Sequence, residues 1–421
     1  MVKSGKKDDF YRQMFKLAIP IIIQNLLSAA VNSSDVIMLN YVGQSAISAV
    51  SLAANYSNIL FMVYYGLGTG ASLLCAQYFG KKNMQAIHAV EGIALRFSLA
   101  ISALVALAAF TIPQRMLLLF TSDQELIAIG SSYIRIMGIT YLCWGVTEIY
   151  LAILRSIGRV TISMALNMLA FGLNILLNAV FIFGLFGAPK LGVTGVAIAT
   201  ASSRLIQLIA CVIVSLLSKD VKLNPIYMFI RSKTLLNDFI HLSLPALGND
   251  LSWSVAFSMY SVIMGHLGSD AVAANSIASI VKNLAGCFCM GLGNGGGIMV
   301  GNELGAGKLE KAKEYGRRLC HLSVSSGIVS GLVLLAFSPL ILRAANLSVT
   351  AEGYLKGMLL ICAYYMIGRS VNGVTISGIF CAGGDSKFGL YCDCISMWCI
   401  MVPLGLIAAF VLKLPVLAVY F

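Results

Sequence analysis

Gly66-Leu67-Gly68-Thr69-Gly70 returns as Gly291-Leu292-Gly293-Asn294-Gly295, which is 225 positions further along the chain (291 minus 66). The same shift places Pro20 on Pro245 without a gap. In both halves the glycine-rich stretch lies inside a long apolar run. A duplicated hydrophobic unit of this length is typical of a two-lobed transporter rather than of an enzyme.

Composition places the chain in a membrane. Of its 421 residues, 59% are hydrophobic and only 11% are charged, and the mean hydropathy is +0.88. A soluble domain carries about 25% charged residues, so this chain lacks the polar groups needed to cover a surface in water. A run of about 20 apolar residues crosses the hydrocarbon core, and the length therefore allows about a dozen spans.

Apolar runs divide the chain into two lobes with a polar linker between them. We expect an N-terminal lobe over 1–218 with six spans, a cytoplasmic linker over 219–238 and a C-terminal lobe over 239–421. The repeat predicts a twelfth span, and the residues after Leu414 supply only its start. The eleven other expected spans are 16–40, 50–77, 89–113, 127–154, 161–186, 192–217, 240–265, 274–302, 316–341, 353–381 and 388–411.

Basic residues are concentrated in every second loop. The N-terminus and the segments after the second, fourth, sixth, eighth and tenth spans contain most of the lysines and arginines that lie outside spans. Such an alternation places these segments in the cytoplasm. We therefore expect a multi-pass protein of the cell (inner) membrane with a cytoplasmic N-terminus. The same alternation accounts for the net charge of +12 without a nucleic-acid partner.

Three further stretches connect the chain to a known family: Leu17-Ala18-Ile19-Pro20, Leu154-Arg155-Ser156-Ile157-Gly158 and Cys381-Ala382-Gly383-Gly384-Asp385. Together with the glycine-rich pair and the repeat, they resemble the MATE family, the multidrug and toxic compound extrusion transporters, of bacterial type. The resemblance covers essentially the whole chain. It implies an all-α polytopic fold, in which two pseudo-symmetric six-helix bundles surround a central cavity and rock to alternate access.

The resemblance also implies a function. It predicts a secondary active multidrug antiporter, monomeric in the bilayer, that exports organic, cationic small molecules in exchange for H⁺ or Na⁺. A lipid-linked oligosaccharide flippase of the same superfamily is the alternative, although it would need a strongly basic cavity, and a passive channel fits the duplication less well. We expect no enzyme activity, metal site or cofactor, because the sequence contains no paired acid–base or metal-binding constellation.

Asp35 lies near the outer end of the first span. An ionisable residue at the centre of a membrane helix costs about 2.5–3.5 kcal/mol, and it therefore tends to face a cavity and have a function. Asn32 lies one turn away on the same face. Asp35 matches the acidic residue of the first helix in MATE proteins, which implies that it binds the coupling ion. The alternative is a carboxylate that extends to the outer interface.

Asn174 and Asn178 share one face of the fifth span, and Thr200 lies in the sixth. In the Na⁺- and H⁺-coupled bacterial branch, matching positions join the first-helix Asp around a cation. The second position in the fifth span is often Asp there, and Asn178 lacks that charge. Hydrogen bonding between neighbouring helices is therefore an alternative role for both asparagines.

Glu148, in the fourth span, is either a second protonatable site or the partner of Arg155, which follows two turns later. The C-terminal lobe contains two acidic candidates, Asp250 in the seventh span and Asp393 in the eleventh.

Another bacterial branch of the family has an acidic residue in the seventh span and another in the tenth. The matching places here lie near Trp253 and Asn372, and neither residue is acidic. We therefore expect that cation site to be absent, with Asn372 a secondary candidate only.

Aromatic and methionine side chains are candidates for lining a drug cavity, since such a cavity accepts flat cations by burial and cation–π contact. Helix packing and lipid contact are the ordinary alternatives for each of them. The candidates are Tyr64, Trp253, Phe257, Tyr260, Met290 and Tyr364. The glycine-rich stretches themselves are not nucleotide-binding loops, because no strand precedes them, and we expect them to allow close approach of helices.

Overall fold

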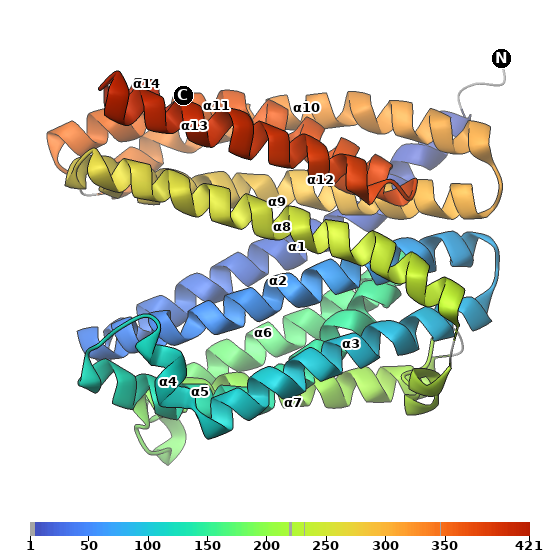
Figure 1. Ribbon diagram of the computed structural model, residues 1–421, viewed down its shortest axis with the longest axis horizontal. Coiled ribbons are helices and arrows are strands. Elements are labelled where there is room, and N and C mark those ends of the chain that lie inside the picture. The colour runs from blue at the N-terminus through green and yellow to red at the C-terminus, as the bar shows by residue number, and fades with distance from the viewer. Residues whose placement is uncertain (1–4, 219–220, 231, 346) are drawn as a thin grey trace. The chain divides into compact units, whose positions relative to one another are not determined.

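The computed structural model describes residues 5–218, 221–230, 232–345 and 347–421, except for the side chains at 5–8, 32, 33, 35–37, 40, 44 and 344. These residues form helices and loops, with no strand among them (Figure 1). The long helices are α1 (Gly5–Asn40), α2 (Gln44–Gly80), α3 (Met84–Thr111), α5 (Gln124–Ser156), α6 (Val160–Phe183), α7 (Gly192–Leu217), α8 (Lys233–His266), α9 (Ser269–Gly305), α10 (Leu309–Ala344) and α11 (Val349–Asn372). The shorter elements are α4 (Pro113–Leu118), η1 (Leu185–Gly187), η2 (Pro225–Phe229), η3 (Gly373–Phe380), α12 (Ser386–Cys394), η4 (Ile395–Met401), α13 (Val402–Leu406), η5 (Ile407–Val411) and α14 (Val416–Tyr420).

Ten helices in the described part of the chain are long and apolar enough to cross a membrane, which confirms the all-α polytopic class. One expected span, 240–265, corresponds to α8 and is not among the ten. Its mean hydropathy is lowered by polar residues in its middle, including Asn249 and Asp250. The start of the expected twelfth span forms α14, directly after Pro415.

The chain divides into two compact units. Unit 1 comprises Met1–Ile22 and Leu244–Phe421, and unit 2 comprises Ile23–Ser243. The boundaries fall inside α1 and α8, whereas the sequence placed them at the linker. The lobes over 1–218 and 239–421 stay a prediction about the moving parts of the protein.

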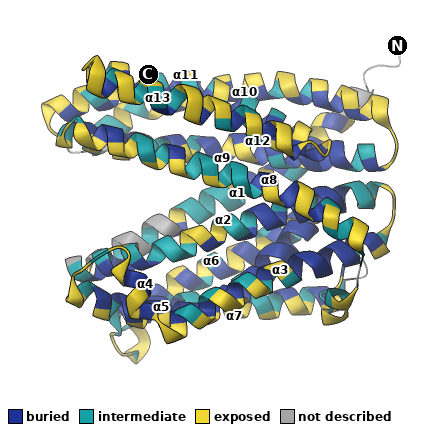
Figure 2. Cartoon of the chain, in the orientation of Figure 1, coloured by how far each residue is buried: buried dark blue, intermediate teal, exposed yellow. Residues whose placement is uncertain are grey.

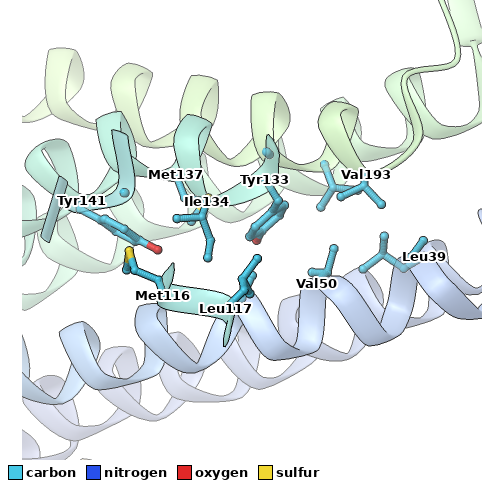
Figure 3. Close-up of a cluster of buried hydrophobic side chains, with 14 of the residues drawn as sticks. Leu39, Val50, Met116, Leu117, Tyr133, Ile134, Met137, Tyr141 and Val193 are labelled. Atoms are coloured by element: carbon cyan, nitrogen blue, oxygen red, sulfur yellow. The ribbon is translucent and has the colours of Figure 1, made fainter. Parts of the chain in front are cut away.

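Each unit has its own apolar core. In unit 2, side chains from α1, α2, α4, α5 and α7 converge on one cluster (Figure 3). Its labelled members are Leu39, Val50, Met116, Leu117, Tyr133, Ile134, Met137, Tyr141 and Val193. In unit 1, a second cluster joins residues of α8, α9, α10, α11 and α14, together with Ala409 of η5. Helix packing inside each unit therefore rests on apolar burial.

Apolar side chains also cover the outside of the helices. Exposed residues recur along α10, for example Leu332, Val333 and Phe337 (Figure 2). Large apolar side chains exposed along a helix of this length would be unfavourable in water, whereas lipid tails accept them. The exposed surface is therefore that of a multi-pass membrane protein.

The repeat preserves glycines where the backbone requires them. Gly43 and Gly268, which are 225 positions apart (268 minus 43), precede α2 and α9 with φ of +135° and +116°. Residues with a Cβ rarely adopt this conformation. Both halves thus begin their second helix after the same glycine-dependent turn.

The glycine-rich stretches allow close contact between helices, as the sequence predicted. A Cβ placed on Gly293 of α9 would lie 2.8 Å from the carbonyl oxygen of Gly373 in η3. In the other half, a Cβ on Gly70 of α2 would lie 2.8 Å from Cβ of Ser243 in α8. The helices approach each other this closely only because glycine has no side chain.

Candidate functional site

Helices α6 and α7 share a chain of hydrogen bonds between polar side chains. Asn178 donates from Nδ2 to Oδ1 of Asn174 over 3.3 Å, and Asn174 donates to Oγ1 of Thr200 over 3.1 Å. Thr200 in turn donates to the carbonyl oxygen of Val196 over 3.0 Å. Asn174 and Asn178 are 6% and 0% exposed. The structure therefore brings together three of the four residues expected to couple transport to an ion.

The fourth residue is Asp35. Its side chain and that of Asn32 lie outside the described residues, so their expected roles stay predictions. Asn174, Asn178 and Thr200 are uncharged and present amide and hydroxyl groups. Cation sites in proteins are built from oxygen ligands and usually include a carboxylate. A cation held at this chain of hydrogen bonds would therefore need a carboxylate from elsewhere.

Glu148 forms an ion pair, which is the second of the two roles expected for it. Nη2 of Arg155 lies 3.4 Å from Oε1 of Glu148, and Nη1 lies 3.4 Å from Oγ of Ser163. Residues 148 and 155 are two turns apart on α5, and Ser163 lies in the first turn of α6. The side chains of Glu148 and Arg155 are only 11% and 16% exposed. A buried carboxylate paired in this way is already compensated.

A polar layer next to this pair was not predicted as a site. Arg204 of α7 lies with Cζ 4.7 Å from the ring centre of Trp144 in α5 and donates to Oε1 of Gln207 over 3.0 Å. Gln207 donates over 2.9 Å to Oδ1 of Asn167 in α6. The signal in the sequence was an arginine and a glutamine three residues apart inside a span, which places both on one face.

In unit 1, Asp393 of α12 is a hydrogen-bond hub. Its Oδ2 accepts from Nδ2 of Asn249 and from Nε1 of Trp253, both over 2.9 Å, and its Oδ1 accepts from Nδ2 of Asn372 over 3.0 Å. Asp393 is 4% exposed. Three donors from α8 and α11 therefore hold one buried carboxylate, as buried charge requires.

This hub occupies the place where the sequence suggested that an acidic site was missing. Trp253 and Asn372 are not acidic, but both donate to a carboxylate that α12 supplies. Asp250 makes no hydrogen bond or ion pair among the described residues. The expected absence of a cation site at this place stays a prediction, as does the secondary role of Asp250, Asn372 and Asp393 in ion coupling.

Two π-helical segments begin beside the hub. η3 starts at Gly373, directly after Asn372, and η4 starts at Ile395, two residues after Asp393. Single π-turns are frequent at functional sites, because the wider turn shifts the side chains that follow it. Both helices that contribute the Asn372–Asp393 bond thus change their winding there.

The six candidate cavity residues have different surroundings. Tyr64 is fully buried, and its Oη bonds to Oγ of Ser102 over 2.7 Å. Tyr260 donates to the carbonyl oxygen of Tyr420 over 3.2 Å. Met290 and Tyr364 are 41% and 70% exposed. Their cavity roles stay predictions.

The remaining two candidates lie together in unit 1. Trp253 and Phe257 are one turn apart on α8, with ring centres 5.3 Å from each other. Trp253 is bonded to Asp393, and the Phe257 ring faces the ammonium group of Lys282.

Comparison with protein families gives one match in each half. The model of the MatE family matches residues 20–180 and 245–407. The two matches start 225 positions apart (245 minus 20), which is the repeat found in the sequence.

Two similar curated proteins illustrate the relatives of this chain. An uncharacterized transporter, YisQ of Bacillus subtilis, is 26% identical over 93% of this chain and 86% of its own length. A probable multidrug resistance protein, NorM of Mesorhizobium japonicum, is 25% identical over 95% of this chain and 87% of its own length.

Solved structures have the same fold. A crystal structure of MATE in complex with MaL6 superimposes with a TM-score of 0.88 at 20% identity, covering 97% of this chain and 91% of the other. A MOP superfamily transporter from Pyrococcus furiosus superimposes with a TM-score of 0.87 at 20% identity, covering 97% of this chain and 90% of the other. That transporter is described as having a binding pocket of reverse polarity that suggests a different function.

Proposed function

This chain belongs to the MatE family, and on that premise we propose that it is a secondary active antiporter, which exports organic solutes in exchange for H⁺ or Na⁺. One observation carries the proposal. Asn178, Asn174 and Thr200 form one chain of hydrogen bonds between α6 and α7, at the positions that the MATE resemblance assigns to ion coupling. Relatives named as multidrug resistance proteins support an efflux role.

Asp35 is the residue we propose for ion coupling. It lies on α1, which contributes Leu39 to the core of unit 2, the unit that contains the asparagines. A carboxylate supplies the negative charge that Asn174, Asn178 and Thr200 lack. Uptake of an external cation by Asp35 would be exchanged for release of the solute, and the membrane potential supplies about 2.3 kcal/mol per charge per 100 mV. The protein needs no cofactor in this scheme.

The orientation of the protein in the membrane and the chemical class of its solute are also part of the proposal. The loop charges favour a cytoplasmic N-terminus in the inner membrane, and the MATE resemblance favours an organic cation. The flippase alternative is not favoured, because the curated relatives are named for multidrug resistance or only as a transporter. The Pyrococcus furiosus protein nevertheless shares this fold with a pocket described as reversed in polarity, so the fold alone leaves the charge of the solute open.

Everted vesicles test the coupling. Ethidium uptake is followed by fluorescence after an imposed proton gradient and, separately, a sodium gradient. We expect one gradient to drive uptake in the wild type and Asp35→Asn to abolish the coupled part. Asp9→Asn, an exposed carboxylate on the same helix, is the matched control and should transport normally. Equal coupled uptake by Asp35→Asn would refute the assignment, and ethidium flux that ignores both gradients would indicate a channel.

A further inference from the structure

Lys282 is a buried lysine without an acidic partner in the part of the chain that the structure describes. It lies in α9, one of the membrane spans, and is 8% exposed. Its Nζ lies 4.6 Å from the ring centre of Phe257 and 5.6 Å from that of Tyr365. Among the described residues, no carboxylate pairs with it. An ammonium group in such a place is unfavourable unless a partner compensates its charge, and ring faces compensate only part of it.

Arg369 is a second cation on the neighbouring helix α11. Its guanidinium lies against Gly286 of α9, where a Cβ would come within 2.7 Å of Cζ. In the described part of the chain it makes no hydrogen bond or ion pair. A guanidinium has five N–H donors in a fixed fork, so all of them lack a protein acceptor here.

The two helices present these groups in register. Lys282 and Gly286 are four residues apart on α9, and Tyr365 and Arg369 are four residues apart on α11, so each pair shares one face. Lys282 faces Tyr365, and Gly286 contacts Arg369. The hydroxyl oxygen of Tyr365 is also buried and has no hydrogen-bond partner among the described residues.

The buried acid of this unit, Asp393, forms no ion pair with Lys282 or Arg369 among the described residues. Asp393 already accepts hydrogen bonds from Asn249, Trp253 and Asn372. The repeat offers a contrast, because Lys282 falls on Ser57 in the first half (282 minus 225), and Ser57 makes a neutral contact with Oη of Tyr141 over 3.3 Å. The charge is therefore a feature of the second half alone. Among the described residues, two cations without an ion pair and a hydroxyl without a hydrogen bond therefore lie on facing helices. An anion would compensate them, whereas an organic cation would be repelled.

We propose that Lys282, Arg369, Tyr365 and Phe257 form a binding site for an organic anion with a flat aromatic body. The acidic group of the ligand accepts hydrogen bonds from Nζ of Lys282 and from the fork of Arg369, which suits a carboxylate or sulfonate. The rings of Phe257 and Tyr365 pack on its body. The inference rests on the proposed function, because it identifies a class of solute for the exporter.

The test is binding of fluorescein, a flat aromatic anion, to the purified full-length protein in detergent, followed by fluorescence anisotropy. We expect saturable binding that Lys282→Gln and Arg369→Gln each weaken by about tenfold or more in Kd. Lys282→Arg and Arg369→Lys should retain most of the affinity. Lys356→Gln, an exposed lysine on α11, is the matched control and should bind as the wild type does. Ethidium, a flat cation, should lose no affinity in the glutamine variants.

Several results would overturn the proposal. One is a wild type that fails to bind fluorescein, and another is that both glutamine variants bind it as the wild type does. A loss of ethidium binding in these variants as large as the loss of fluorescein binding would overturn it too. If Lys282→Gln fails to fold, Tyr365→Phe replaces it, since it removes only the hydroxyl and should weaken fluorescein binding by about threefold. Displacement of fluorescein by phosphatidylglycerol would assign the site to a lipid headgroup and overturn its assignment to a solute.

Binding and transport separate this inference from the proposed function. Fluorescein binding is measured without any gradient, whereas the antiport is measured as gradient-driven ethidium uptake. Gradient-driven uptake with no fluorescein site would refute only the anion site. A fluorescein site that depends on Lys282, in a protein that moves neither ethidium nor fluorescein when a proton or sodium gradient is imposed, would refute only the antiport.

Discussion

Asn372 donates a hydrogen bond from Nδ2 to Oδ1 of Asp393 over 3.0 Å, and it joins α11 to α12 at the point where both helices begin to unwind into π-turns. Trp253 and Asn249 donate to the other carboxylate oxygen. A single buried carboxylate thus connects three helices of unit 1. Replacing Asp393 should therefore lower the free energy of unfolding by more than replacing an ordinary surface residue does.

Replacing Asp393 tests this connection. Asp393→Leu leaves three partly buried donors without their acceptor, and an unsatisfied donor costs up to about 1–3 kcal/mol. Asp393→Asn keeps one carbonyl oxygen and should lose less. We expect the apparent melting temperature in detergent to fall in the order wild type, Asp393→Asn, Asp393→Leu. Asp9→Asn, an exposed carboxylate, should leave it unchanged, and a leucine variant as stable as the wild type would contradict the role of the hub.

The ion pair between Glu148 and Arg155 predicts non-additive losses. Removing one partner leaves the other charge buried, which is strongly destabilising, whereas removing both is often tolerated. We expect Glu148→Gln and Arg155→Gln each to lower the melting temperature. The double variant should lose less than the sum, with a coupling of about 0.5–3 kcal/mol. Losses that add up would mean that the two side chains act independently.

Close approach at Gly293 predicts a steric effect of one methyl group. In Gly293→Ala the new Cβ meets the carbonyl oxygen of Gly373 at 2.8 Å, so backbone must move and stability should fall by about 1–3 kcal/mol. Gly353→Ala, in α11, is the control, because a Cβ there has nothing within 4 Å. Alanine is favoured over glycine in a helix by about 1 kcal/mol, so this variant should be equally or more stable. The same loss in both variants would rule out the steric explanation.

Repeat, spans and family resemblance could be predicted from the sequence because they depend on local order along the chain. This class contains the 225-residue shift and the glycines Gly43 and Gly268 before the second helix of each half. It also contains ten of the eleven complete expected spans. Helix α8 was the exception, because polar residues in its middle, including Asn249 and Asp250, lower its mean hydropathy.

Partners of polar side chains were harder to predict. Asn174 and Asn178 could be placed together, because four residues make one helical turn. Glu148 left two roles open, and the structure shows its ion pair with Arg155, whereas its role as a protonatable site stays a prediction.

The sequence by itself determined that this protein is a duplicated bundle of membrane helices, since hydropathy, loop charges and glycine positions follow from residue order and the thickness of a bilayer. Only the tertiary structure decided which polar groups meet. Asp393 lies 140 residues from Trp253, so only packing between helices brings this donor to the carboxylate. Lys282 and Arg369 lie on separate helices, and packing gives neither of them an acidic partner among the described residues.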